Sequence, residues 1–295
     1  MQTILISGGS GLIGSDLKKY FTQFGYSVRI LTRKPTQKNK NAFYWNLEDK
    51  TIDSDAFENV DIVINLAGSS IIGGRWTKSR KKELTHSRVN ATKLLIDTIN
   101  DKKLPIKHFI QASAMGYYGN SNESMLTEES PKGNDFMGNL CHEWESATQN
   151  LNPTIKKSIL RIGLYMSING GVYPILARLA RFKLLSAFGN GQMWAGYTHH
   201  REFAHLIHQI LLGNITPDTY NAVGKEPFQM NILMKCIARK SGRANFLPNV
   251  PAFLLKIVLG EASATLLNSY RVTSPKLASF DAHQYTGIEQ AIQSF

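Results

Sequence analysis

Apolar residues along this chain fall into two kinds of pattern, which alternate from the N-terminus to about residue 162. Short apolar runs rich in Val and Ile predict buried strands, and stretches with apolar residues three or four positions apart predict helices. Strands are expected at residues 4–6, 27–32, 42–45, 60–66, 107–112 and 155–162. Helices are expected at residues 13–24, 77–101 and 138–149. This alternation favours an α/β fold, a doubly wound parallel sheet formed by residues 1–162.

The alternation stops after residue 162, where residues 163–171 are predicted as a loop. Further elements are expected as helices at residues 172–183, 201–212, 228–240 and 251–268, a turn at 189–191 and a short strand at 220–223. We therefore expect a smaller, mainly helical C-terminal portion, residues 163–295, parts of which can return to the sheet. It would cover one edge of the nucleotide fold and form a substrate cleft with it.

A glycine-rich turn separates the first strand from the first helix. A glycine permits a tight turn and a close approach of the backbone to a pyrophosphate, and Gly14 allows the helix to pack against the sheet. The N-terminus of the helix adds free N–H groups and a partial positive charge. We predict a Rossmann-type dinucleotide site, the alternative being a purely structural turn. The predicted contacts are Gly8, Ser10, Gly11, Leu12, Ile13 and Gly14.

Residues at the ends of two other predicted strands are expected to contact the same dinucleotide. The strand at 60–66 is followed by Ala67 and Gly68, and these small residues, with Leu66, let the backbone come near the cofactor. The strand at 27–32 is followed by Arg33, and no Asp or Glu occurs between residues 25 and 47. An acid here would bind the ribose of NAD, whereas a guanidinium pairs with the 2′-phosphate of NADP. The sequence therefore favours NADP(H), the alternative being that Arg33 is an ordinary loop arginine.

Composition places few further limits on this protein. The chain has 295 residues, 42% of them hydrophobic and 19% charged, which is enough for one large domain or two smaller ones. Two cysteines are too few for a disulfide framework and favour the reducing cytoplasm. No apolar run is as long as a membrane span, and the first strand begins too near Met1 for a signal peptide. We expect no membrane partner.

The formal net charge of +12 raises the question of an anionic partner. The densest group of cations lies at residues 75–82, at the start of a predicted helix, with Trp76 as its only aromatic residue. Base stacking needs more aromatic side chains than this. We therefore interpret the group as a solvated basic face that attracts an anionic cofactor or substrate, with no nucleic-acid partner.

Several motifs give the chain a family resemblance. It resembles the extended short-chain dehydrogenases/reductases of the sugar-nucleotide-epimerase type, and within them an atypical epimerase-like subgroup of unassigned substrate. The resemblance rests on the glycine turn and on residues 63–68, 75–77, 112–119, 127–131, 144–145, 160–163 and 250–261. The sequence departs from the family at residues 197–202, Tyr-Thr-His-His-Arg-Glu, where the family's first acid is missing.

The resemblance implies a bound NADP(H) and a substrate cleft, but an altered catalytic centre. Ser113 matches the serine that binds the substrate oxygen. The family's Tyr and Lys pair falls near Met137 and Cys141, and a Met cannot transfer a proton, nor a Cys supply the fixed cation. Tyr117 is then the candidate acid/base. Its alternative role is packing beside Tyr118, under the cofactor or along the cleft.

A tyrosine needs a nearby cation to act as a base at neutral pH, and Arg161 and His199 are the candidates for that charge. Adjacent His199 and His200 do not make a metal site, because no Cys, His or carboxylate spacing supports one. Cys141 on an apolar helix face is expected to be an inert core thiol.

Two functions follow from the sequence. The first is an NADP(H)-binding oxidoreductase or epimerase that acts on a hydroxyl- or carbonyl-bearing small molecule, nucleotide-sugar-like molecules included. The alternative is a non-catalytic NADP(H)-binding regulatory or interaction protein, suggested by the missing Tyr and Lys. In either case we expect a monomer or a homodimer.

Overall fold

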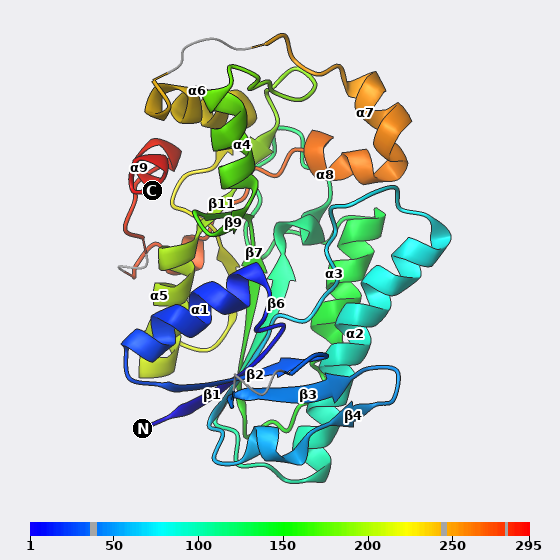
Figure 1. Cartoon of the computed structure of the whole chain (residues 1–295), viewed down its shortest axis with the longest axis vertical. Coiled ribbons are helices and arrows are strands. Elements are labelled where there is room, and N and C mark those ends of the chain that lie inside the picture. Colours follow the sequence, from blue (N-terminus) through cyan, green and yellow to red (C-terminus); the bar gives the residue numbers. More distant parts are fainter. Residues whose placement is uncertain (36–39, 243–246, 281–282) are drawn as a thin grey trace.

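A mainly parallel β-sheet forms the centre of the protein (Figure 1). The computed structural model describes residues 1–35, 40–242, 247–280 and 283–295. Within these residues the sheet has eight strands. They are β1 (Thr3–Ser7), β2 (Ser27–Thr32), β3 (Ala42–Asn46), β4 (Thr51–Ile52), β5 (Ile62–Asn65), β6 (His108–Ala114), β7 (Lys156–Ile162) and β12 (Thr219–Ala222).

The parallel strands all end on the same side of the sheet, which we call its carboxyl edge. The order is β12-β7-β6-β5-β1-β2-β3-β4, and every neighbouring pair is parallel except β3 with β4. The chain leaves β1 toward β2 and β3 and then returns to β5 on the other side of β1. The point where the strand order reverses therefore lies between the carboxyl ends of β1 and β5, the position where open α/β sheets bind their ligands, and we call it the crevice between β1 and β5. The expected doubly wound sheet is confirmed.

Two pairs of helices cover the two faces of this sheet (Figure 1). On one face α1 (Leu12–Gln23) packs against α5 (His200–Leu212), and on the other α2 (Lys78–Asp101) packs against α3 (Phe136–Ser146). The alternation of side chains along β1 explains both layers. Ile4 and Ile6 contribute to the core beneath α1 and α5, whereas Leu5 contributes to the core beneath α2.

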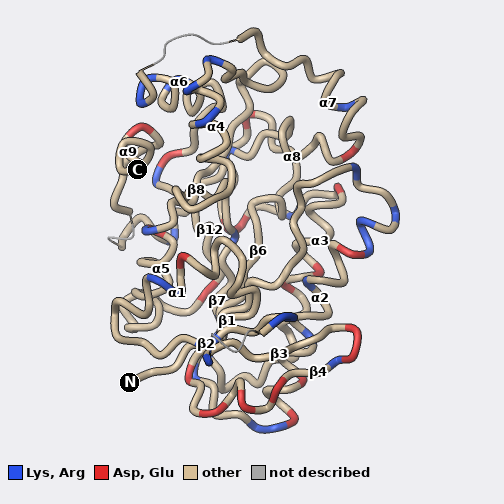
Figure 2. The backbone as a smooth tube through the Cα atoms, viewed as in Figure 1, with Lys and Arg blue, Asp and Glu red and all other residues tan. Residues whose placement is uncertain are grey.

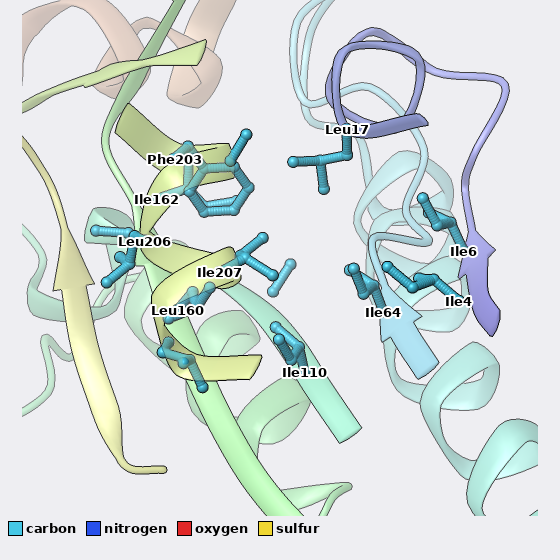
Figure 3. Close-up of a cluster of buried hydrophobic side chains, with 14 of the residues drawn as sticks. Ile4, Ile6, Leu17, Ile64, Ile110, Leu160, Ile162, Phe203, Leu206 and Ile207 are labelled. Atoms are coloured by element: carbon cyan, nitrogen blue, oxygen red, sulfur yellow. The ribbon is translucent and has the colours of Figure 1, made fainter. Parts of the chain in front are cut away.

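Figure 3 shows the first of these cores, where Leu17 of α1 and Phe203 of α5 approach the strands. Each fully buried aliphatic or aromatic side chain there stabilises the fold by about 1.5–3 kcal/mol relative to exposure. The sheet positions labelled in this view are Ile4, Ile6, Ile64, Ile110, Leu160 and Ile162. Because this core joins α5 to β1, the C-terminal half of the chain is anchored directly to the nucleotide fold.

The C-terminal portion lies beyond the carboxyl edge of the sheet (Figure 1). Its small strands are β8 (Leu164–Ser167), β9 (Gly170–Gly171), β10 (Trp194–Ala195), β11 (Tyr197–His199) and β13 (Phe228–Gln229). Its helices are α4 (Val172–Arg181), α6 (Met230–Lys240), α7 (Ala252–Leu259), α8 (Ala264–Leu267) and α9 (Ile288–Gln293). The strand expected at 220–223 forms as β12 and returns to the main sheet beside β7.

Two predictions for this portion are wrong. Residues 163–171 are not a loop, because β8 pairs with β11 and β9. A short strand whose partner lies about thirty residues away leaves little periodicity in its own sequence. Residues 251–268 are not one helix either. Gly260 has a φ of +58°, and this left-handed residue ends α7 before the chain continues as a 3-10 turn and α8.

Charge is distributed unevenly over the elements (Figure 2). The cations at residues 75–82 lie at the outer end of α2, and acidic residues gather around β4. In the described ranges, no helix is long and apolar enough to cross a bilayer.

Candidate cofactor site and active site

The glycine turn after β1 is packed so tightly that side chains do not fit. A Cβ on Gly8 would lie 2.8 Å from the carbonyl oxygen of Leu66, and Gly8 has a φ of +68°. A Cβ on Gly9 would lie 2.4 Å from Cγ2 of Ile30, and one on Gly14 would lie 2.5 Å from Cα of Gly9. At Gly8, Gly9 and Gly14 the turn therefore has room for backbone alone, and Ser10 carries the exposed side chain of the turn.

The N-terminus of α1 faces the same turn without competition from acidic groups. Gly11 is the N-cap residue, no side chain in the described part of the chain caps the helix, and its first turn has no acid. Ser10 and Gly11 are exposed, and Leu12 and Ile13 are half-buried. The free N–H groups and the helix dipole favour an anion here. This cradle fits a pyrophosphate.

A buried polar network fixes the neighbouring strand ends. Asn65, the last residue of β5, donates hydrogen bonds to Thr92 of α2 (2.8 Å) and to Gln111 of β6 (2.9 Å). Its side-chain oxygen accepts from Ser7 of β1 (2.5 Å) and from the N–H of Ala67 (3.2 Å). The network holds Leu66, Ala67 and Gly68 at the crevice in a single arrangement.

Arg33 lies exposed directly after β2. It is close enough to α2 to act on Glu83: a hydrogen bond from Arg80 lowers the pKa of Glu83, and the charge of Arg33 contributes to the same shift. Arg33 thus stands at the carboxyl edge of the sheet on the β2 side of the crevice.

Ser113 of β6 is buried, and its hydroxyl is engaged. Its Oγ donates a hydrogen bond of 2.6 Å to Oε1 of Glu145 on α3. Glu145 in turn accepts two hydrogen bonds from Arg161 of β7, at 2.8 and 2.9 Å. A serine hydroxyl has one proton to donate, so Ser113 binds a substrate oxygen as a donor only after it releases Glu145.

Tyr117 and Tyr118 lie in a 3-10 turn, Met115–Tyr118, immediately after β6. The guanidinium carbon of Arg161 lies 3.5 Å from the centroid of the Tyr117 ring. The hydroxyl of Tyr118 accepts a hydrogen bond from Arg161 (2.8 Å) and donates one to Asn221 (2.6 Å). Burial raises the pKa of Tyr118 to about 12. Tyr118 is therefore a packing residue, and half-buried Tyr117 is the tyrosine available to a ligand.

Arg161, and not His199, supplies the cation beside Tyr117. His199 lies at the far end of β11, where its ring stacks on Phe295 and its Nε2 pairs with Ser294 at 3.1 Å. Burial lowers the pKa of His199 to about 3. In the ranges that the structure describes, no three His, Cys, Asp or Glu residues gather as metal ligands would.

The face of α3 that lies below the tyrosines is apolar. Met137 and Cys141 are both buried, and a Cβ on Gly116 would lie 3.1 Å from Cε of Met137. Burial raises the pKa of Cys141 to about 12, so the thiol stays protonated at neutral pH. Neither Met137 nor Cys141 therefore acts as a proton-transfer group at neutral pH, and the titratable group that α3 brings to Ser113 is Glu145.

Sequence reasoning missed one residue, Arg88 of α2. It is buried, and its guanidinium carbon lies 2.9 Å from the position that a Cβ on Gly68 would occupy. The pattern contained a signal, because Arg88 falls one turn after Leu84, on the face of α2 that also carries Ala91 and Leu95. A charged residue on an apolar helix face is unusual and points to a specific partner or function.

With this geometry in place, comparison with known proteins identifies the family. The model of the NAD dependent epimerase/dehydratase family matches residues 4–222, most of the chain. The chain belongs to this family. Epimerase family protein YfhF of Bacillus subtilis is 32% identical over 290 residues, covering 97% of this chain and 94% of that protein.

Two further similar proteins are named only as epimerase family proteins, without a stated reaction. The chloroplastic epimerase family protein SDR39U1 homolog of Arabidopsis thaliana is 26% identical over 278 residues, covering 92% of this chain and 80% of that protein. The crystal structure of human epimerase family protein SDR39U1 (isoform 2), determined with NADPH, superposes with a TM-score of 0.90. It is 25% identical and covers 99% of this chain and 98% of that one.

Proposed function

We propose that this protein binds NADP(H) across the crevice between β1 and β5. The observation that carries the proposal is the side-chain-free cradle of Gly8, Gly9 and Gly14 at the uncapped N-terminus of α1. The human relative crystallised with NADPH supports the same reading. In this arrangement the adenosine half of the cofactor extends over β2, and the nicotinamide half extends over β5 and β6.

The preference for NADP(H) over NAD(H) is assigned to Arg33. It stands at the end of β2, where an NAD-preferring site usually has an acid that binds the ribose hydroxyls. A guanidinium forms two parallel hydrogen bonds with a phosphate, an interaction that NADH does not offer.

The proposed activity is an oxidoreduction or an epimerisation of a small molecule that bears a hydroxyl or carbonyl group. The bound cofactor supplies or accepts a hydride. Tyr117 moves the proton at the substrate oxygen, and Arg161 against its ring holds the side chain in place and stabilises negative charge on the phenol. Ser113 orients the substrate oxygen once its hydroxyl turns away from Glu145.

A second function has its own supporting observation. Met137 and Cys141 occupy the face where the family's acid/base pair is expected, and the proton of Ser113 is already donated to Glu145. Both facts favour a non-catalytic NADP(H)-binding protein whose partner senses the reduced or oxidised cofactor. The two described cysteines, both free and buried, support a reducing compartment such as the cytoplasm for either function.

The test is a titration of the protein with NADPH and NADH, with Arg33→Ala and the control Lys34→Ala. We expect tight binding of NADPH, a loss of roughly tenfold or more in the Arg33 variant, and little change in the control. A panel of carbonyl compounds, sugar nucleotides and quinones then separates the two functions. Turnover supports the enzyme, and NADPH binding without any turnover favours the regulator. Binding of neither nucleotide overturns both.

A further inference from the structure

The buried guanidinium of Arg88 sits directly beneath the loop that follows β5. It donates hydrogen bonds to the carbonyl oxygens of Ser69 (3.0 Å) and Leu84 (3.1 Å), and it lies over the ring of Trp144, 5.2 Å from its centroid. The absence of a Cβ on Gly68 makes room for it. These contacts hold the charge rigidly at the carboxyl edge of β5.

This charge is not neutralised by a nearby acid. Its hydrogen bonds go to neutral carbonyl oxygens, and no carboxylate within residues 1–35, 40–242, 247–280 and 283–295 forms an ion pair with it. Arg161, the other buried arginine at this edge, is paired with Glu145. Burial lowers the pKa of Arg88 only to about 10, so the group stays charged at neutral pH. A buried cation left unpaired is costly for folding, and a ligand at the site is one reason to retain it.

Arg88 also extends toward α3, the helix that lacks the lysine expected from the family resemblance. Helices α2 and α3 pack side by side (Figure 1), and the charge of Arg88 acts on the thiol of Cys141, although burial is what dominates the pKa of that group. Cys141 stands where the family resemblance places the fixed cation. Through its contact with Trp144, Arg88 therefore brings a cation to the packed side of α3, where α3 itself has the protonated thiol of Cys141.

We propose that Arg88 is the fixed cation of the nicotinamide end of the cofactor site and makes the protein select NADPH over NADP⁺. The proposal rests on the proposed binding of NADP(H), in which the nicotinamide half lies over β5 and β6. The oxidised nicotinamide ring carries a positive charge and the reduced ring does not. A buried cation beneath it repels the oxidised form alone, in surroundings where water screens little.

The experiment compares three ligands: NADPH, NADP⁺, and 2′-phospho-ADP-ribose, which has no nicotinamide. Wild-type protein is expected to bind NADPH at least about fivefold more tightly than NADP⁺. Arg88→Gln is expected to bring the two dissociation constants to within about twofold, and to leave 2′-phospho-ADP-ribose binding unchanged. Arg88→Lys keeps the charge and is expected to keep the preference. Lys93→Gln removes an exposed charge from the same helix and serves as the matched control.

The possible outcomes separate this proposal from the one it rests on. Failure of the wild type to bind either nucleotide overturns the proposed function. Tight NADPH binding with no preference over NADP⁺ in the wild type overturns the role of Arg88 alone, and this result does not depend on whether a variant folds. An equal loss of affinity for all three ligands in Arg88→Gln also overturns it, because that result means that Arg88 supports either the fold or the part of the ligand that all three share.

Discussion

Arg161 stacks on the ring of Tyr117, with its guanidinium carbon 3.5 Å from the ring centroid. The same guanidinium is held edge-on by both oxygens of Glu145. Arg161 of β7 thus contacts both helix α3, through Glu145, and the turn after β6, through Tyr117. Because the guanidinium is fixed by two hydrogen bonds to a carboxylate, the orientation of the Tyr117 ring is fixed as well.

Tyr117→Phe tests the proposed acid/base role. The variant is expected to lose turnover by about 10²- to 10⁴-fold on any substrate found in the panel, because general acid/base catalysis contributes that much. NADPH affinity should stay within about threefold of wild type, since the ring remains in place. Full turnover in this variant would show that another group moves the proton.

Tyr118→Phe is expected to affect stability instead. It removes a hydroxyl that donates to Asn221 and accepts from Arg161 in a buried place. We expect a loss of about 1–3 kcal/mol in the free energy of unfolding, measured by denaturant titration. Tyr117→Phe is the matched control and should change stability by less than about 0.5 kcal/mol. Equal effects of the two variants would contradict the division of roles.

Glu145→Ala leaves the buried charge of Arg161 without its partner. The expected loss is about 3–5 kcal/mol, because breaking a buried ion pair is more costly than replacing it. The double variant Glu145→Ala with Arg161→Met should recover part of that stability, and a double-mutant cycle measures how much. If the double variant loses more free energy of unfolding than the two single variants lose together, this account is wrong.

Glu202, in the first turn of α5, predicts a stability that depends on pH. Burial raises its pKa from 4.5 to about 7, while its Oε1 accepts hydrogen bonds from the N–H groups of Gln284 and Tyr285. The folded state therefore holds a proton that the unfolded chain has already released. The contribution of this group to stability is full below about pH 4.5 and is lost as the pH rises through about 7.

Glu202→Gln keeps the acceptor oxygen and removes the titration. At pH 8 it should be more stable than wild type by up to about 3 kcal/mol, with the difference shrinking toward pH 5. Neighbouring His199 and His200 have pKa values lowered by burial and shift stability in the opposite direction at acid pH. The difference between variant and wild type, measured at each pH by denaturant titration, isolates Glu202. A difference that is constant with pH would contradict the shifted pKa.

The local sequence determined much of the nucleotide fold. Strand and helix periods, together with the glycine turn, predicted the parallel sheet and the first βα unit, because these patterns report burial and turn chemistry within a few neighbouring residues. The position of Arg33 after its strand followed from the same reading. Strand β8 was missed because its parallel partner β11 lies about thirty residues away in the chain, and β9 was missed because two glycines leave no pattern of apolar positions.

Only the tertiary structure decided how the site is assembled. Ser113 and Glu145, Arg161 and Tyr117, and Arg88 and Gly68 each come from different elements, and the packing of those elements sets every one of these contacts. A period or a motif reports which face of an element is buried, but not which side chain of another element it meets. The sequence by itself therefore determined the scaffold and the place of the cofactor cradle. The packing of α2, α3 and β7 against the strand ends decided which charges surround it.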